Sequence, residues 1–174
     1  MKKFLTGIYE VTLDEAGRIA IPRYLRTILE KNEVVLTKGA DPCIWLYTAE
    51  EWDVRAEAIM ERTDSDSEDD RDIRRYYIGH AHPLDMDKQG RILVPSILRE
   101  HADLSKDCIV LGLYDYIEIW DKERYKAYEC SQEEFRKKSE EFARMKKEGK
   151  NAGNNARSGV TGGSDTLPRS EGQG

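Results

Sequence analysis

Residues 14–26 read DEAGRIAIPRYLR, and residues 87–99, at an offset of 73, read DKQGRILVPSILR. Seven of these thirteen aligned positions are identical, and the offset continues without a gap as far as Glu50 and Glu123. A gapless repeat of this length indicates two copies of one structural unit. Each property of the D-x-x-G-R turn is therefore expected twice in the chain.

Each copy predicts a strand, a tight turn, a short second strand and a helix. Asp14 and Asp87 suit the first turn position, where their side chains are expected to bind backbone N–H groups of their own turns. Gly17 and Gly90 supply the residue with positive φ that the turn needs. A proline opens each helix, because its missing N–H costs nothing at the first helical position.

The whole chain predicts an α+β fold. Strands are expected at residues 4–13, 18–21, 34–38, 44–47, 80–86, 91–94, 108–112 and 117–120. Helices are expected from Pro22, after Thr48, from Asp69, from Pro95 and after Asp121. In the helix that begins at Asp69, the apolar positions predict an inward face made of Ile73, Tyr76 and Tyr77.

Four segments are predicted along the chain. Residues 1–61 form the first repeat, residues 62–79 an acidic linker and helix, and residues 80–145 the second repeat with a long C-terminal helix. That single final helix carries an apolar stripe of Tyr125, Tyr128, Phe135 and Phe142. Residues 146–174 are expected to be a disordered tail, because a segment so rich in glycine and polar residues buries too little surface to offset its ordering entropy.

The net charge of −6 comes mainly from one acidic segment. Between Glu61 and Asp70, six acidic residues accompany a single base, Arg62, and the rest of the chain is nearly neutral. The chain is therefore not expected to coat nucleic acid nonspecifically, because neutralisation of phosphates drives such binding. Local basic residues near the repeated turns matter more than the global charge.

The chain is expected to be cytoplasmic. Cys43, Cys108 and Cys130 are odd in number and lack C-x-x-C spacing, so we interpret them as unpaired thiols in a reducing compartment. No apolar run approaches the ~20 residues that cross a bilayer, so no membrane partner is expected.

The arginine that ends each turn motif is the candidate DNA contact. Arg18 and Arg91 follow a tight reversal, so each is expected to project from the tip of a strand pair. A planar guanidinium binds two phosphate oxygens, or the O6 and N7 atoms of guanine, at once. Lys88 and Arg23 are expected to add phosphate contacts. Alternatively, each arginine pairs with the aspartate of its own turn, or with a neighbour on the strand, and has only a structural role.

Other kinds of site have little support in the sequence. His80 and His82 lie on one predicted strand without a third metal ligand nearby in sequence. The acids at 64–70 lack the glycine and the terminal glutamate of an EF-hand loop. No G-x-x-x-x-G-K loop, nucleophile elbow or Cys/His/Asp order indicates catalysis. We therefore predict no enzyme, no metal, no cofactor and no small-molecule substrate.

The two motifs resemble those of the MraZ family. Each reads D-x-x-G-R-I-x-[IV]-P-x-x-L-R and is followed by G-x-x-x-x-I-x-x-[YW], and the resemblance covers roughly residues 4 to 145. It implies a relation to AbrB/MazE-type swapped-hairpin transcription factors. The fold implied is a duplicated swapped-hairpin β-barrel with pseudo-twofold halves and peripheral helices.

The resemblance also implies a function. It implies a ring-shaped homo-oligomer, associated with the nucleoid, that binds short direct repeats in double-stranded promoter DNA. Transcription of the division and cell-wall gene cluster, including the protein's own gene, would be under its control. By the family's pattern, the DNA contacts here are Arg18 and Arg91.

The first turn departs from the family's pattern. Family members often carry lysine just before the first glycine, where this chain has Ala16, and Glu15 adds a negative charge beside it. The second turn, with Lys88, is therefore expected to bind phosphate better. The main alternative function is a swapped-hairpin oligomerisation module that binds another protein, as antitoxins of the related fold do, through the helix carrying Phe135 and Phe142.

Overall fold

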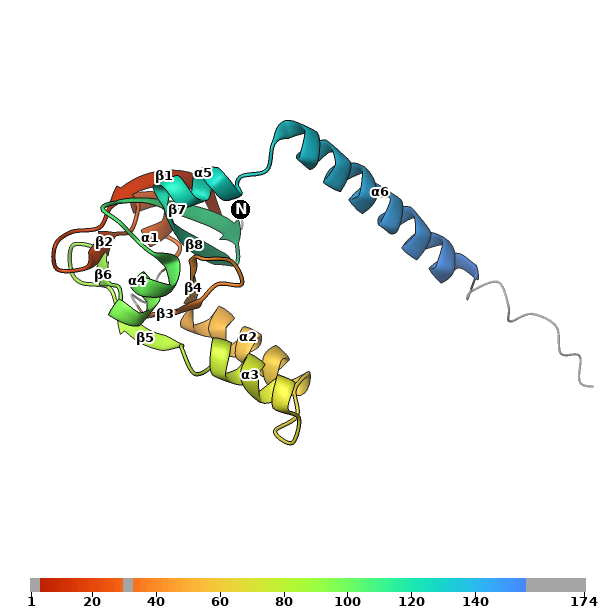
Figure 1. Ribbon diagram of the computed structural model, residues 1–174, viewed down its shortest axis with the longest axis horizontal. Helices are drawn as coiled ribbons and strands as arrows, with labels where there is room; N and C mark the ends of the chain where they lie inside the picture. Colours follow the sequence, from red (N-terminus) through yellow and green to blue (C-terminus); the bar gives the residue numbers. More distant parts are fainter. Residues whose placement is uncertain (1–3, 30–32, 156–174) are drawn as a thin grey trace, which may run out of the picture. The chain divides into compact units, whose positions relative to one another are not determined.

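A computed structural model describes residues 4–29 and 33–155. It divides the chain into two units, Met1–Glu129 and Cys130–Gly174. The first unit contains both copies of the repeat, and the described part of the second is one helix, α6 (Figure 1). In the part of the chain described, no helix is both long and apolar enough to span a membrane.

The strands of the first unit form two antiparallel sheets. The larger sheet has the order β1 (Leu5–Thr12), β7 (Asp107–Tyr114), β8 (Tyr116–Asp121), β4 (Ile44–Thr48), β3 (Glu33–Lys38) and β5 (His82–Asp85). The smaller sheet pairs β2 (Arg18–Ala20) with β6 (Arg91–Leu93). The predicted α+β class is confirmed. A closed barrel is not found among the described residues, because the large sheet runs from β1 to β5 without returning.

Short helices connect and cover these strands. They are α1 (Arg23–Arg26), α2 (Ala49–Glu61), α3 (Glu68–Tyr77), α4 (Ser96–Ala102) and α5 (Lys122–Tyr128). The helix expected after Thr48 is present, and Thr48 caps it, since Thr48 Oγ1 accepts a hydrogen bond from the Glu51 N–H at 3.1 Å. Helices α2 and α4 contact β3 and β4, whereas α5 contacts β7 and β8 (Figure 1).

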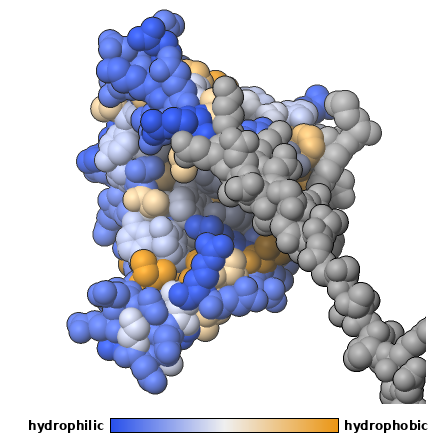
Figure 2. Space-filling model, turned by 90° about the vertical axis from the view of Figure 1, so that its right-hand side faces the viewer, coloured by the Kyte–Doolittle hydropathy of each residue, from blue (hydrophilic) through white to orange (hydrophobic). Residues whose placement is uncertain are grey.

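Both repeats contribute to one hydrophobic core. Equivalent positions of the two copies are fully buried, namely Ile19/Ile92, Leu25/Leu98, Ile44/Ile117 and Leu46/Ile119. Burial of such side chains contributes about 1.5–3 kcal/mol each. The face in Figure 2 is mostly hydrophilic, with hydrophobic residues in separate spots, as expected for a chain with 36% charged residues.

Helix α3 differs in part from its predicted inward face. Tyr76 donates a hydrogen bond to the Gly39 carbonyl, and the Tyr77 ring stacks on Trp45. Ile73, however, is 44% exposed. The inward prediction for Ile73 is therefore wrong, because α3 packs against β3 without fully burying any of its residues.

The predicted single final helix is also wrong. Helix α5 stops at Tyr128, and α6 (Gln132–Asn155) begins after a capping box. In this box the Ser131 N–H donates to Glu134 Oε2 at 2.8 Å, and the Glu134 N–H donates to Ser131 Oγ at 3.3 Å. These contacts provide acceptors for two backbone N–H groups that have no partner within the helix, which favours the start of a new helix at Gln132.

Helix α6 also overlaps the predicted disordered tail. It continues past position 146 to Asn155, because adding a residue to an existing helix costs less than nucleating one. The rest of the predicted tail, 156–174, lies outside the described residues.

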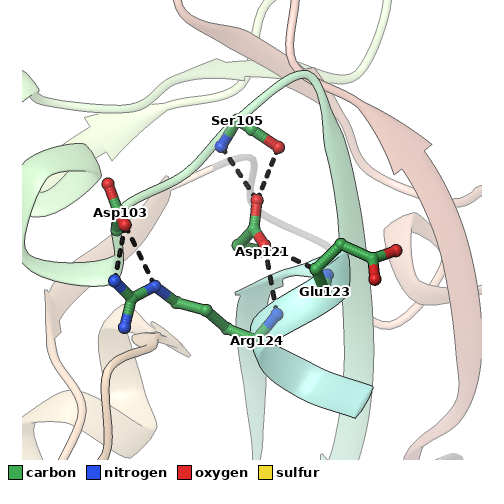
Figure 3. Close-up of polar contacts among 5 residues, drawn as sticks. All are labelled: Asp103, Ser105, Asp121, Glu123 and Arg124. Atoms are coloured by element: carbon green, nitrogen blue, oxygen red, sulfur yellow. Dashed lines mark hydrogen bonds and ion pairs between the residues drawn. The ribbon is translucent and has the colours of Figure 1, made fainter. Parts of the chain in front are cut away.

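A buried carboxylate anchors the junction between β8 and α5 (Figure 3). Asp121 accepts hydrogen bonds from the N–H groups of Glu123 and Arg124 through Oδ1, and from the N–H and Oγ–H of Ser105 through Oδ2. Arg124 is held in turn by an ion pair with Asp103. Burial alone would raise the pKa of Asp121, but these hydrogen bonds outweigh it and lower the pKa.

Candidate nucleic-acid interface

The two-stranded sheet β2–β6 pairs equivalent strands of the two repeats, which are related by a local twofold axis. Ile19 lies opposite Ile92, which is its own equivalent in the repeat. The flanking hydrogen bonds are equivalent as well. The Ile21 N–H donates to the Gly90 carbonyl, and the Val94 N–H donates to the Gly17 carbonyl, both at 2.9 Å. Each turn is therefore held by the strand of the other repeat.

One face of this ribbon is available for contact. Ile19 and Ile92 are fully buried on the inner face. Because side chains alternate along a strand, the outer face carries Arg18 opposite Leu93, and Arg91 opposite Ala20. Leu93 is 52% exposed. The two predicted arginines thus lie at diagonal corners of one exposed face, and Ala20 and Leu93 occupy the other two corners.

The first turn leaves its arginine unpaired. The Asp14 carboxylate accepts a hydrogen bond from the Arg18 N–H at 2.8 Å, and the Gly17 N–H donates to the Asp14 carbonyl. Within the described residues, no hydrogen bond or ion pair involves the guanidinium of Arg18. Asp14 and Gly17 therefore form the backbone hydrogen bonds of the turn, and among the described residues the guanidinium donors of Arg18 are unused.

The second turn has the same backbone geometry but a paired arginine. Asp87 Oδ1 accepts from the N–H groups of Gln89 and Arg91, and Asp87 Oδ2 accepts from Arg91 Nε at 2.8 Å. These contacts, led by the Arg91 N–H, lower the pKa of Asp87. The pairing with the aspartate of its own turn is thus present for Arg91 but not for Arg18 among the described residues. Arg91 still has 36% of its side chain exposed, so its outer nitrogens remain accessible.

Two further arginines, which are not among the predicted site residues, pack against the two turns. Arg26 is the last residue of α1 in the first repeat, and its side chain lies against Gly90 of the second repeat. Its Nη1 donates a hydrogen bond to the Gln89 carbonyl at 3.0 Å. Arg99 likewise lies against Gly17. Both Nε atoms are buried and have no hydrogen-bond partner among the described residues. The signal was present, since Arg26 and Arg99 are identical positions of the repeat.

Replacement of Gly90 by alanine is expected to reduce the free energy of unfolding by about 1–3 kcal/mol. Gly90 has a φ of 74°, and an added Cβ would collide with the middle of the Arg26 side chain. Gly17→Ala is the matched control. Gly17 has a similar φ of 81°, but its added Cβ would meet the guanidinium of Arg99 at 3.0 Å, a much weaker clash, so a smaller loss is expected. Urea unfolding of both variants measures the difference, and equal losses would contradict the role of Arg26.

The fold brings the other two predicted DNA contacts together. Arg23 of α1 and Lys88 of the second turn line one hollow of about 340 Å³, together with Arg26. Both Arg23 and Lys88 are exposed, and neither side chain has a hydrogen bond or ion pair within the described part of the chain. Three cations from two repeats thus converge beside the β2–β6 ribbon.

Comparisons with known proteins agree with the duplication. The family described as "MraZ protein, putative antitoxin-like" matches the chain twice, at residues 4–76 and 77–146. The two matches start 77 − 4 = 73 residues apart, which is the offset of the repeat.

Individual relatives span most of the chain. The "Transcriptional regulator MraZ" of Treponema denticola is 40% identical over 124 residues, covering 71% of this chain and 86% of that protein. The protein of the same name from Hydrogenovibrio crunogenus is 41% identical over 128 residues, covering 71% and 84%. That from Thermoanaerobacter sp. is 42% identical over 124 residues, covering 71% and 85%.

Proposed function

The chain belongs to the MraZ family, and from this premise we propose that it regulates transcription by binding double-stranded DNA through the outer face of the β2–β6 ribbon. Relatives that cover most of its length are named transcriptional regulators, which supports a regulatory and non-enzymatic role. On this proposal, Arg18 and Arg91 contact base edges or phosphates, while Lys88 and Arg23 contact phosphates.

The shape of the ribbon is the observation that carries this proposal. The major groove of B-DNA admits a two-stranded β-ribbon, and arginine is the side chain that most often reads guanine there. Arg18 and Arg91 lie diagonally on the exposed face of such a ribbon, on a backbone tied to the core by Ile19 and Ile92. Rigid support of this kind favours recognition, because less conformational entropy is lost on binding.

Assembly into a ring forms part of the proposal. A single ribbon makes few contacts, and each good base contact supplies only about 1–3 kcal/mol of discrimination. In a homo-oligomer, neighbouring chains bind neighbouring direct repeats, and the second binding event gains from a high effective concentration. The interleaving of β2 with β6 supports swapped-hairpin halves, at residues 1–61 and 80–145. We propose the division and cell-wall gene cluster, including the protein's own gene, as the target.

A titration with labelled DNA tests the proposal. The probe is a fluorescein-labelled duplex of the region directly upstream of the protein's own gene, followed by fluorescence anisotropy. Arg18→Ala and Arg91→Ala are each expected to weaken binding by about 1–3 kcal/mol, and the double variant by roughly 100-fold or more. Light scattering checks that the oligomer persists. Normal binding by an intact double variant would refute the site.

A protein partner is the second candidate function. Helix α6 exposes Phe135 and Phe142, at 61% and 71%, seven residues apart on a helix of 24 residues. This spacing suits helix–helix contact, and the family description includes the word antitoxin. If the protein fails to bind the upstream duplex at any salt concentration, this second function becomes the better account.

A further inference from the structure

The two repeats differ in charge where their backbones are alike. The hollow lined by Arg23, Arg26 and Lys88 has a partial counterpart beside the equivalent helix of the other repeat. That hollow shares the α4 positions but not the turn, and is lined by Ser96, Arg99, Glu100, Asp103 and Leu104. We call the first the basic hollow and the second the acidic hollow. At an offset of 73, Ser96 replaces Arg23 and Glu100 replaces Thr27. In the turns themselves, Glu15 replaces Lys88.

The basic hollow has free donors. Its single acid, Asp87, is already neutralised by Arg91 at 2.8 Å. Arg26 is fixed by its hydrogen bond to the Gln89 carbonyl, whereas the exposed Arg23 and Lys88 have no hydrogen-bond or ion-pair partner in the described ranges. Cations fixed around a small hollow are suited to a phosphate, which accepts several charge-assisted hydrogen bonds at once.

The acidic hollow is unsuited to the same ligand. Arg99 is the only basic residue among those that line it, and Glu100 is exposed beside it. Asp103 is paired with Arg124, which lies outside this lining (Figure 3). A phosphate here would face uncompensated negative charge from Glu100, and like charges at short range repel.

We infer that each chain binds a phosphate of the DNA backbone in the basic hollow only, so that its two pseudo-equivalent halves engage DNA unequally. The inference rests on the proposed function and adds that the ribbon binds DNA in one orientation. A symmetric ribbon would sit equally well on DNA in either orientation. Phosphate capture on one side selects one orientation, and chains that all face the same way match direct repeats rather than inverted ones.

The salt dependence of DNA binding tests this inference. The logarithm of the binding constant falls with the logarithm of salt by about 0.9 for each phosphate contact. Because Arg23 and Lys88 are proposed to hold one phosphate in each chain, Arg23→Gln/Lys88→Gln is expected to make this slope shallower by about 0.9 for each bound chain. It is also expected to weaken binding roughly 10-fold near 0.1 M salt. The measurement uses the full-length protein, the upstream duplex and KCl from about 50 to about 200 mM.

Matched variants separate a local contact from net charge. Glu15→Gln/Ser96→Gln changes the equivalent positions of the other repeat and is expected not to make the slope shallower. Arg75→Gln/Lys126→Gln removes the same charge from side chains that already pair with Asp72 and Glu123, and should leave the slope unchanged. Glu15→Lys/Ser96→Arg places the two bases at the equivalent positions of the other repeat and should steepen the slope by about 0.9 for each bound chain.

The outcomes distinguish this inference from the proposed function. If the wild-type protein does not bind the duplex, the proposed function fails. If it binds and Arg23→Gln/Lys88→Gln keeps the wild-type slope, only the basic hollow is refuted. Equal losses from that variant and from Arg75→Gln/Lys126→Gln would also refute it, since net charge would then explain the effect. The Glu15→Lys/Ser96→Arg variant provides an independent test should the double glutamine variant misfold.

Discussion

Replacement of Ile92 by alanine is expected to lower the free energy of unfolding by about 2–5 kcal/mol. Ile92 is fully buried and lies opposite Ile19, at the centre of the pairing between the two repeats. The truncation leaves a cavity beneath the paired strands β2 and β6. Because the core around it is closely packed, the neighbouring side chains are not expected to fill this cavity. Ile19→Ala is expected to cost a similar amount, because the two positions are equivalent.

Urea unfolding measures this effect. Leu93→Ala is the matched control, since it alters the next residue of β6 but removes a side chain that is 52% exposed. Its effect should stay within about 0.5 kcal/mol. A loss below about 1 kcal/mol for Ile92→Ala would contradict a shared core at the ribbon. It would also weaken the argument that the core holds Arg18 and Arg91 rigidly.

Replacement of Asp121 by alanine is expected to cost about 3 kcal/mol. The change removes the cap of α5, which is worth about 0.5–2 kcal/mol. It also removes the two hydrogen bonds that the N–H and hydroxyl of Ser105 donate to this carboxylate, and each hydrogen bond contributes about 0.5–1.5 kcal/mol net. Thr48→Ala is the matched control in the first repeat. Thr48 is the equivalent cap but accepts only the Glu51 N–H, so a loss of about 1 kcal/mol is expected.

The contribution of Asp121 is expected to depend on pH. Its pKa is lowered on folding, so the unfolded chain takes up this proton more readily than the folded protein. The stabilisation is therefore complete above the ordinary pKa of 3.8 and is lost as the pH falls through the lowered value. The difference in unfolding free energy between wild type and Asp121→Asn should narrow below about pH 4. A difference that stays constant down to pH 2 would contradict this assignment.

Local sequence patterns predicted most of the elements, because turns and caps depend on residues close together in the chain. The carboxylates of Asp14 and Asp87 accept backbone hydrogen bonds within their own turns, and Thr48 caps α2. The prediction of a single final helix is wrong because an apolar stripe at helical spacing does not show where a helix begins. The capping box of Ser131 and Glu134 starts a new helix there. The inward orientation of Ile73 was wrong because periodicity does not reveal how deeply a neighbouring strand covers a helix.

Local sequence patterns do not predict which of the two turn arginines forms an ion pair. Arg18 and Arg91 occupy identical positions of the repeat, yet only Arg91 is held by the aspartate of its own turn. The sequence left both possibilities open for both residues, because side-chain pairing depends on surroundings that the motif does not describe.

The sequence by itself determined that the chain holds two copies of one unit, where their turns lie, and which arginines follow them. These properties follow from spacing and from the backbone preferences of aspartate, glycine and proline. Only the tertiary structure decided that Arg26 supports the turn at Gly90, and that Arg23 and Lys88 share a hollow. The physical reason is the pairing of β2 with β6, which places the helix of one repeat against the turn of the other.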